Sequence, residues 1–317
     1  MKPVMAEKHA ALPPTVDRPP KRTGLNRRSA LSLLEGLLYL SPSLLLMGIF
    51  VFYPLVKSIR LSLYLTNPLG QEKVWVGLSQ YKEIFQTGNF GSSLITTLLF
   101  TIYTVLPGIA VALLLAVIAN WKLKGIGFFR TVFAIPIVVA VASASMIWMM
   151  LYNPSSGVLN YLLGKVGGSP IKWLVDPGWA LISVAMVNMW RNLGFNTIIL
   201  LSGLQSIPEE LYESGRIDGA GPWHLFRHIT IPMLSPTLFF LLIVSVIGAL
   251  QTFGEINVLT QGGPVGATNV IVYSIYREAF FNFRFGFASA QSMVLFLIIL
   301  VLTLLQFYFL ERRVFCQ

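Results

Sequence analysis

The chain has 317 residues, of which 55% are hydrophobic and only 11% are charged, and its formal net charge is +10. Soluble domains carry about a quarter charged residues, and disordered chains have low hydrophobicity, so both classes are excluded. The composition predicts a multi-span membrane protein, in which positive charge is typical of cytoplasmic edges and does not indicate nucleic-acid binding. The single cysteine, Cys316, cannot form an internal disulfide.

Six uncharged or nearly uncharged stretches are long enough to cross a bilayer as helices, which takes about 20 apolar residues. In chain order they are residues 36–56, 93–119, 131–152, 179–204, 229–254 and 287–310. The sequence therefore predicts an all-α polytopic membrane protein with six transmembrane helices in residues 31–317. A basic, proline-rich tail, expected to be disordered, precedes them in residues 1–30.

Two apolar stretches allow a second interpretation. Residues 36–56 follow a basic region, as a signal peptide would, but their apolar part exceeds the 7–15 residues of a signal core and no small-residue cleavage site follows. We therefore expect an uncleaved first span. Residues 265–281 are opened by Gly262-Gly263-Pro264 and interrupted by Arg277-Glu278. We expect an extracytoplasmic loop there, with a short helix that dips toward the core.

The distribution of lysine and arginine sets the expected orientation. Six spans place both termini on one side, and the tail on that side carries seven basic residues. Outside the tail, the inner segments carry seven basic residues and the outer segments carry eight, but the inner segments are shorter. Because basic segments remain in the cytoplasm, both termini are expected there.

The segment between the fourth and fifth spans differs from a simple connector. Residues 206–228 read SIPEELYESGRIDGAGPWHLFRH. Ser206 and Glu209 predict a capping box at the start of a short helix that ends near residue 217. The Asp-Gly pair at 218–219 predicts a turn, and the Gly-Pro pair at 221–222 predicts the start of a second short helix.

Several interpretations of this segment were weighed. A plain connector needs only a few residues, whereas this one shows Trp223 and Phe226 among charges, which favours a docking surface. Its three glycines do not form a phosphate-binding loop, because no strand precedes them and no Gly-Lys-Ser/Thr follows. His224 and His228 have a metal-ligand spacing, but no His-Glu-x-x-His pattern or third ligand accompanies them. A packing or interface role is therefore favoured for the two histidines.

This segment resembles the cytoplasmic coupling motif of permease subunits in binding-protein-dependent ABC importers. That motif starts Glu-Ala-Ala, has a glycine after three more residues, and ends Ile-x-Leu-Pro. Ser214-Gly215 replaces the two alanines here, and Ile231 replaces the leucine. The resemblance implies a type I ABC importer permease fold, with coupling helices at 206–228 that bind an ATPase through Glu213, Gly219, Ala220, Trp223, Phe226, Ile229 and Pro232.

The rest of the chain after the tail resembles the carbohydrate-importing branch of this family. The matching motifs are Tyr53-Pro54, Gly77-Leu78-x-x-Tyr81, Ile135-Pro136, Asn153-Pro154-x-x-Gly157 and Thr260-Gln261-Gly262-Gly263-Pro264. Ile275-Tyr276-Arg277-Glu278 and Ala290-Gln291-Ser292 are similar to the first permease subunit of sn-glycerol-3-phosphate importers. Disaccharide permeases share much of this pattern, so a sugar and sn-glycerol-3-phosphate both remain expected solutes.

The chain contains no Gly-x-x-x-x-Gly-Lys-Ser/Thr loop, so it cannot bind ATP by that route and the energy for transport has to come from outside the chain. The resemblance implies two cytoplasmic ATPase subunits that bind ATP and Mg²⁺, a second permease in a heterodimer, and an extracytoplasmic solute-binding protein. It also implies a bacterial or archaeal inner membrane. The chain itself is expected to bind no cofactor, metal or nucleic acid and to catalyse no reaction.

Polar side chains inside the spans are costly and therefore informative. In one interpretation they only stabilise the fold, with Arg191 pairing with an acid and the amides bonding neighbouring helices. In the other they line the solute pathway, where amides bind hydroxyl groups, an aromatic face binds a sugar ring and Arg191 binds a phosphate ester. The candidate pathway residues are Asn188, Trp190, Arg191, Asn196, Gln251 and Glu255, and the second permease is an alternative holder of the solute.

Three other classes of membrane protein were compared with the importer permease. A secondary transporter, driven by an ion gradient, is the main alternative, but internal repeats are not evident and only Arg191 is an ionisable residue well inside a span. A membrane enzyme would need clustered nucleophiles, bases or metal ligands, and a channel would need a filter or a charged ring. The sequence shows neither pattern.

Overall fold

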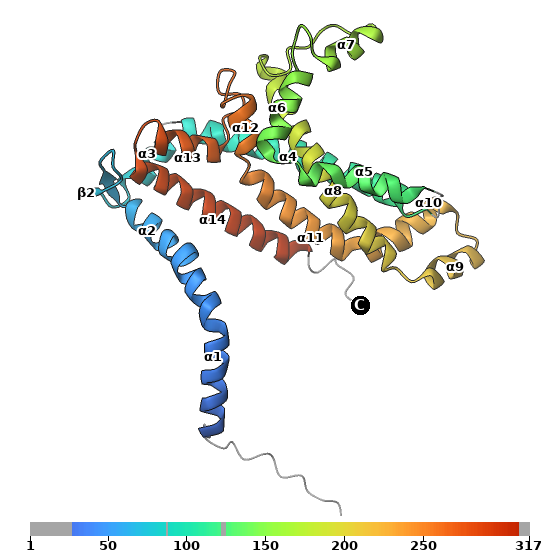
Figure 1. The fold of residues 1–317 in the computed structure, drawn as a ribbon, viewed down its shortest axis with the longest axis horizontal. Coiled ribbons are helices and arrows are strands. Elements are labelled where there is room, and N and C mark those ends of the chain that lie inside the picture. Colours follow the sequence, from blue (N-terminus) through green and yellow to red (C-terminus); the bar gives the residue numbers. More distant parts are fainter. Residues whose placement is uncertain (1–26, 87, 122–124, 311–317) are drawn as a thin grey trace, which may run out of the picture. The chain divides into compact units, whose positions relative to one another are not determined.

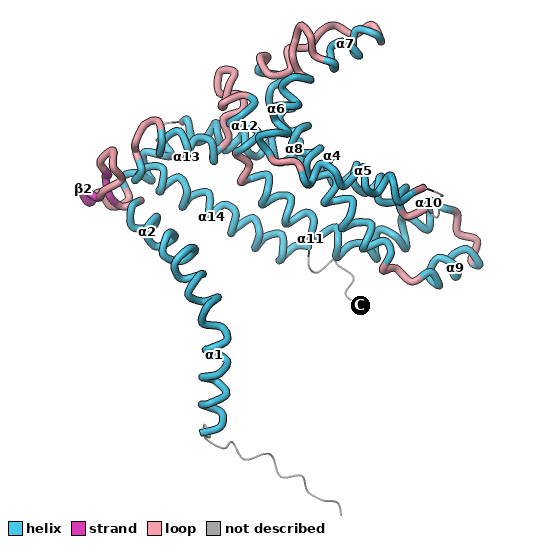
Figure 2. The backbone as a smooth tube through the Cα atoms, in the orientation of Figure 1, coloured by secondary structure: helices cyan, strands magenta, loops and turns pink. Residues whose placement is uncertain are grey.

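The computed structural model describes residues 27–86, 88–121 and 125–310, with side chains between 35 and 308. The chain divides into two compact units, residues 1–55 and 56–317. Helices dominate, and a two-stranded hairpin is the only sheet in the described part of the chain (Figure 1, Figure 2). The predicted all-α class is confirmed.

The first predicted span begins in the first unit. Helix α1 (Arg27–Met47), the π-helical turn η1 (Gly48–Phe52) and α2 (Tyr53–Leu61) follow one another directly. Residues 35–61 form a helix of 27 residues that is long and apolar enough to cross a bilayer, as predicted for 36–56. The tail predicted for 1–30 lies outside the described residues as far as residue 26, and α1 starts at Arg27.

A small hairpin follows α2. Strand β1 (Tyr64–Thr66) pairs antiparallel with β2 (Glu72–Trp75), and α3 (Ser79–Gln86) comes next. The buried side chain of Gln80 donates hydrogen bonds to the carbonyl groups of Ser62 and Tyr64 at 2.9 and 3.0 Å. Because buried carbonyl groups need donors, these bonds fix α3 against the hairpin.

Four long helices form the body of the second unit: α4 (Asn89–Ala119), α8 (Pro177–Gln205), α11 (Ile231–Leu250) and α14 (Phe285–Leu310). Helix α8 contacts α4 and α11, and α11 contacts α14 (Figure 1). The helices predicted at 93–119, 179–204 and 287–310 lie inside α4, α8 and α14 and are confirmed as helices. Asp176 caps α8 by accepting a hydrogen bond from the Gly178 N–H at 2.8 Å.

The third predicted span is not one straight helix. Helices α5 (Ile126–Val138) and α6 (Val141–Leu151) meet at 104°, and Val139 between them is extended. Pro136 has no N–H to donate, and the β-branched residues 137–139 lose side-chain freedom in a helix, so the helix ends there. The prediction of a single helix over 131–152 is therefore wrong, and the pair is a broken span or a re-entrant loop.

Helix α7 (Val158–Lys165) belongs to the segment that connects α6 with α8. The Asn160 side chain donates to the carbonyl groups of Pro154 and Ile171 at 3.1 and 2.9 Å. Its oxygen accepts from the Ile171 N–H at 3.1 Å and from Nε1 of Trp173 at 3.0 Å. These four bonds use the full capacity of the amide and hold the segment in shape.

The fifth predicted span begins earlier than expected. The predicted helix start at Gly221-Pro222 is confirmed, because α10 (Pro222–Leu225) begins there with Gly221 as its N-cap. Helix α10, the π-helical turn η2 (Phe226–Thr230) and α11 form one uninterrupted run, so this helix is not separate from the fifth span. No helix-breaking residue separates the two segments. Turn η2 ends at Thr230, two residues before Pro232, which cannot donate to the carbonyl group four residues earlier, and the wider turn accommodates this missing bond.

Helices α12 (Gly254–Leu259) and α13 (Ile271–Phe280) complete the second unit, after a break at residues 251–253. Helix α13 is the short helix predicted within 265–281. Its first residue, Ile271, donates its N–H to Oγ1 of Thr97 at 3.0 Å, and Asn269 donates to Ser93 at 3.0 Å. These bonds attach the start of α13 to α4. The depth of α13 in the membrane stays a prediction.

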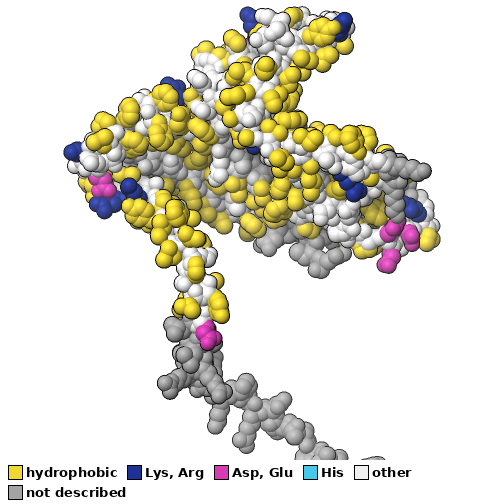
Figure 3. Space-filling model, viewed as in Figure 1, with side chains coloured by type: hydrophobic (Ala, Val, Ile, Leu, Met, Phe, Trp, Pro, Cys, Tyr) yellow, Lys and Arg dark blue, Asp and Glu magenta, His cyan; other side chains and the backbone are white. Residues whose placement is uncertain are grey.

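Among the described residues, four helical segments are long and apolar enough to cross a bilayer: residues 35–61, 89–119, 222–259, which includes the break at 251–253, and 285–308. The α5–α6 pair adds a fifth if it is one span. Helix α8 has 29 residues, enough to cross, but it also carries several polar side chains. The count of six therefore stays a prediction. Hydrophobic side chains cover much of the second unit's visible surface, as lipid contact requires (Figure 3).

Two glycines allow α8 to approach its neighbours closely. A Cβ on Gly194 would lie 2.3 Å from the carbonyl oxygen of Phe133 in α5. A Cβ on Gly203 would lie 2.6 Å from Oγ1 of Thr237 in α11. Small residues at such crossings are typical of helix packing in membranes, where close contact replaces the hydrophobic effect as the source of association.

We expect Gly194→Ala to push α5 away from α8, because the atom that it meets is backbone and cannot rotate aside. Overpacking of this kind costs about 1–3 kcal/mol, so the thermal midpoint of the purified protein in detergent, followed by tryptophan fluorescence, should fall. Gly91→Ala in α4 is the control, since a Cβ there meets no atom within 4 Å. Equal midpoints for the two variants would contradict the close crossing.

Candidate functional site

Residues 209–230, called the elbow here, contain α9 (Glu209–Ile217), a tight turn, α10 and η2. Gly219 has φ +78°, and it ends α9 in a left-handed turn. The Ala220 N–H donates to the Gly215 carbonyl at 2.9 Å, and the Gly219 N–H donates to the Arg216 carbonyl at 3.0 Å. This pair of bonds is a Schellman motif, for which glycine is the favoured residue. The predicted turn at 218–219 is confirmed.

The capping box predicted for the start of α9 is wrong. Pro208 is the N-cap residue, and no side chain caps the helix there. Ser206 instead ends α8, and its hydroxyl donates to the Gly203 carbonyl at 2.8 Å. Because α8 extends to residue 205, Ser206 is the C-cap of that helix, and it lies too far before α9 to cap its first turn.

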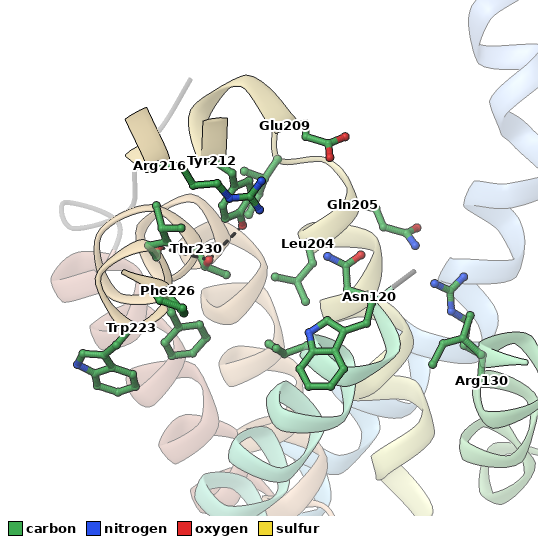
Figure 4. A pocket seen from close by; sticks show the side chains of 16 residues that line it. Asn120, Arg130, Leu204, Gln205, Glu209, Tyr212, Arg216, Trp223, Phe226 and Thr230 are labelled. Atoms are coloured by element: carbon green, nitrogen blue, oxygen red, sulfur yellow. Dashed lines mark hydrogen bonds between the residues drawn. The ribbon is translucent and has the colours of Figure 1, made fainter. Parts of the chain in front are cut away.

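Two contacts hold α9 against the start of the long helix. The hydroxyl groups of Tyr212 and Thr230 lie 3.0 Å apart and share a hydrogen bond (Figure 4). A Cβ on Gly215 would lie 2.6 Å from Cδ2 of Leu225 and 3.1 Å from Cδ1 of Ile229. Gly215 therefore replaces the motif's alanine at a position where the two segments touch.

The surface of the elbow combines exposed aromatic and acidic groups. Trp223 is 71% exposed, and its ring stacks on Phe226 with centroids 5.8 Å apart (Figure 4). Glu209 and Glu210 occupy the first turn of α9 and Arg216 the last, which suits the helix dipole. The acidic groups gather at that end of the second unit (Figure 3). An exposed aromatic pair beside charges is suited to binding another protein.

The seven predicted coupling residues separate into two groups. Glu213, Gly219 and Trp223 are exposed, and Ala220 and Phe226 are half-buried. Ile229 is also half-buried and, like Tyr212, packs against the core cluster that includes Leu204, and Pro232 is half-buried in the first turn of α11. All seven therefore keep some exposed surface, and Ile229 differs in that it also packs against the core.

An apolar pocket of about 900 Å³ lies between the elbow and the ends of α4, α5 and α8. Trp223, Phe226 and Arg130 line it from the elbow and from α5 (Figure 4). Arg130 donates to the Ala119 carbonyl at 2.8 Å and so satisfies the end of α4. The pocket thus places an apolar hollow directly beside the exposed aromatic pair.

His224 and His228 stack with ring centroids 4.0 Å apart, and His228 Nδ1 lies 3.1 Å from the His224 carbonyl oxygen. Among the described residues, no group of three or more histidine, cysteine, aspartate or glutamate side chains is suited to hold a metal ion. The two histidines pack on each other at the surface of the elbow.

A second cluster lies where α8 meets α12, and it is called the polar cluster here: Asn188, Arg191, Thr252 and Glu255. Arg191 Nη1 donates to Glu255 Oε1 in an ion pair. Asn188 donates to the same oxygen at 3.1 Å and to the Thr252 hydroxyl at 3.4 Å. The side chain of Glu255 is 3% exposed and that of Arg191 is 22% exposed. The cluster supplies the acidic partner that the fold-stabilising interpretation of Arg191 expects.

A cavity of about 190 Å³ adjoins this cluster between α4, α8 and α11. Asn188, Asn192 and Asn196 line it from successive turns of α8, and Thr104 and Ser245 face it from α4 and α11. Amides and hydroxyls around a small cavity are able to bind a solute that carries hydroxyl groups. The sequence did not single out Thr104 or Ser245, because isolated hydroxyl residues occur in many apolar helices.

The remaining two pathway candidates lie apart from this cavity. The ring of Trp190 meets Trp148 edge to face at 5.8 Å. Gln251 is exposed at the end of α11. The structure therefore brings Asn188, Arg191 and Glu255 into direct contact, adds Asn196 through the cavity, and leaves Trp190 and Gln251 outside the cluster.

Residues 93–315 match the family described as "Binding-protein-dependent transport system inner membrane component". The chain belongs to this family. It is 37% identical over 280 residues to the sn-glycerol-3-phosphate transport system permease protein UgpA of Agrobacterium fabrum, covering 87% of this chain and 94% of that protein. The protein of the same name from Yersinia pestis is 36% identical over 276 residues, covering 86% and 92%.

The permease also resembles solved structures. A bacterial ABC transporter involved in the import of the acidic polysaccharide alginate aligns with a TM-score of 0.79 and 26% identity, over 90% of this chain and 99% of that one. The bacterial alginate ABC transporter in complex with a periplasmic protein bound to alginate pentasaccharide aligns with the same TM-score and 25% identity, over 90% and 98%. The permease is thus a multi-pass ABC importer subunit, and none of these matches favours a secondary transporter.

We expect Arg191→Met to destabilise the permease strongly, because it leaves Glu255 buried without its counter-charge. Breaking a buried ion pair costs about 3–5 kcal/mol, whereas replacing both charges by apolar groups is often neutral. The double variant Arg191→Met with Glu255→Met should therefore recover most of the loss in thermal midpoint, measured in detergent. If the double variant is no more stable than the single one, the two charges do not balance each other.

Proposed function

We propose that this permease works in an ATP-driven importer that takes up a carbohydrate-type solute, with sn-glycerol-3-phosphate as the first candidate. The relatives named for that solute align with more than nine-tenths of their own length. The family and the alginate neighbour with its periplasmic protein support a solute-binding protein as the donor. A second permease completes the pathway as a heterodimer, and two cytoplasmic ATPase subunits bind ATP and Mg²⁺.

One observation carries the coupling role: the elbow is continuous with a membrane helix. Trp223 is exposed and Phe226 half-buried at the start of a helical run that passes through η2 into α11 and ends at Leu250. The Tyr212–Thr230 bond ties α9 to the same run. A partner that moves the elbow therefore moves α11, and ATP-driven closure of the ATPase pair would switch the spans between outward and inward states in this way.

The elbow faces the cytoplasm in this proposal, with both termini on the same side of a bacterial or archaeal inner membrane. Glu213, Gly219, Ala220, Trp223 and Phe226 form the contact surface for the ATPase, and Ile229 and Pro232 stabilise it from inside. Aromatic residues in well-packed contacts supply much of the binding free energy of protein interfaces. Trp223 is thus the principal anchor.

The polar cluster and its cavity form this permease's part of the solute pathway. Asn188 and Asn196 bind hydroxyl groups of the solute in the 190 Å³ cavity, and Arg191 attracts the phosphate of a phosphate ester. Trp190, Gln251 and Glu255 belong to the same proposed pathway. Trp190 and Gln251 act before or after the cavity, because they lie outside it.

The coupling role is tested at the turn of the elbow. Gly219→Val places a β-branched residue at φ +78°, which costs about 1–3 kcal/mol of backbone strain and disrupts the turn between α9 and α10. We expect the complete importer to reach the membrane but to lose most solute uptake and most ATP hydrolysis stimulated by the binding protein. Both are measured in proteoliposomes.

Gly221→Ala is the matched control for this experiment. Gly221 lies in the same turn, has φ −73°, and a Cβ there meets no atom within 4 Å. It should keep both activities. If uptake and stimulated ATP hydrolysis survive Gly219→Val, the elbow does not transmit the ATPase motion.

The pathway is tested by removing its polar groups. We expect Asn196→Leu to reduce uptake about tenfold or more, since an aliphatic side chain in the cavity cannot bind a hydroxyl group and leaves it unpaired. Trp190→Ala should reduce uptake as well, if its ring guides the solute. Ser202→Ala, at an exposed position of α8, is the control. Unchanged affinity and rate in both variants would remove these residues from the pathway.

A further inference from the structure

The ion pair in the polar cluster uses only part of the arginine. Both donors that meet Glu255 reach the same oxygen, Oε1, and one of them comes from Asn188. Arg191 contributes only Nη1 to the pair. Arginine normally binds carboxylates and phosphates with two parallel N–H groups, so this pair leaves the preferred two-pronged geometry unused.

The other donors of Arg191 are available to a second acceptor. The Nε group is buried, and it has no hydrogen-bond partner in the described part of the chain. A buried donor without a partner costs free energy, so the site is incomplete as it stands. The Arg191 side chain is 22% exposed, against 3% for Glu255, so an incoming group reaches the arginine before it reaches the glutamate.

The neighbourhood also supplies partners for an uncharged part of the same solute. Asn188 bridges the two features, because it donates to Glu255 and also lines the cavity with Asn192 and Asn196. Thr104 and Ser245 add hydroxyl groups on the opposite walls of the cavity. A solute whose anionic group binds Arg191 would therefore place its hydroxyl groups beside the asparagines of the cavity.

We propose that Glu255 is a resident counter-ion, which occupies Arg191 while the pathway is empty and is displaced by an anionic, hydroxyl-bearing solute. This inference rests on the proposed function and narrows its substrate to phosphate esters and acidic sugars. A small inorganic anion can bind only Arg191, so it does not displace the carboxylate of Glu255, which is held beside the arginine by the chain. A solute that also fills the cavity forms additional hydrogen bonds with the asparagines, and these make the displacement of Glu255 from Arg191 favourable. When the solute leaves, Glu255 returns to Arg191.

The test uses the complete importer in proteoliposomes, with uptake and ATP hydrolysis measured in parallel. Labelled sn-glycerol 3-phosphate, glucuronate and maltose are the solutes, and sodium sulfate is the competing small anion. Glu255→Gln removes the resident charge but keeps an amide that accepts hydrogen bonds. We expect sulfate to inhibit uptake by this variant at a concentration about tenfold or more lower than for the wild type, because nothing now excludes it from Arg191.

A double variant separates recognition from stability. Arg191→Gln with Glu255→Gln leaves no buried charge unpaired and should fold, as shown by a thermal midpoint in detergent close to that of the wild type. Its uptake of the anionic solute per ATP hydrolysed should fall about tenfold or more, and its sensitivity to sulfate should return to the wild-type value. A purely structural ion pair would change neither quantity. Glu278→Gln, which removes another glutamate paired with an arginine, is the control and should match the wild type.

Three results would overturn the proposal. One is an unchanged response to sulfate in Glu255→Gln, and another is full uptake of the anionic solute by the double variant. The third is a wild-type importer that transports maltose but neither sn-glycerol 3-phosphate nor glucuronate. This result would contradict the displacement of Glu255 from Arg191 but not the importer function. A wild-type importer without ATP-dependent uptake of any of the three solutes would instead contradict the solute class under the proposed function.

Discussion

A helix that is predicted to cross a bilayer and that carries an arginine and three asparagines has to find partners for them inside the protein, because lipid offers none. Helix α8 is that helix, and the positions of its neighbours follow from this constraint. Glu255 brings the start of α12 against it, and Asn188 joins the same contact. Gly194 and Gly203 let α5 and α11 approach closely on other sides. The most polar of the long helices is thus also the one around which the others are arranged.

The two functional regions are connected through the chain that follows α8. From Pro222 to Leu250 the backbone is one helical run, which at 1.5 Å per residue spans about 40 Å. The chain then breaks for three residues and continues as α12, whose second residue is Glu255. The elbow is therefore connected to the acidic side of the Arg191 pair by a rigid helix and one short break. In the proposed function, the motion of the elbow and the recognition of the solute therefore involve one continuous segment of the chain.

The sequence predicted the features that depend on local composition. Long apolar stretches marked α4, α8 and α14, and the Asp218-Gly219 pair marked the left-handed turn of the elbow. It failed where distant contacts or neighbouring helices decide. Ser206 has the chemistry of a cap, but α8 is long enough to include it in its own last turn. Pro136 was visible, yet its effect on residues 131–152 depended on the β-branched residues that follow it.

In the two candidate sites, too, the sequence predicted the residues but not the contacts that they make with distant parts of the chain. An arginine within a span predicts an acidic partner, but the sequence alone left the partner open, since it lies 64 residues away on a helix that starts after a break. The residues of the coupling motif were identified from their spacing. Their separation into exposed and half-buried positions was not, because the motif includes Gly219 and Ile229 without indicating the burial of either. Burial in this region depends on how α9 folds back on η2, which is set by Gly215 and by the Tyr212–Thr230 bond.

The continuity of the elbow with α11 also determines where this protein can be divided. In a chimaera between related permeases, a junction placed near residue 229, at the predicted start of the span, would cut through η2 and alter the phase of the helix beyond it. The natural junctions are Pro208, before α9, and residues 251–253, where the helix stops on its own. If the elbow binds the ATPase as proposed, that contact surface is inherited together with a whole membrane helix, so a permease that acquired a new ATPase by recombination would also acquire part of the proposed pathway wall.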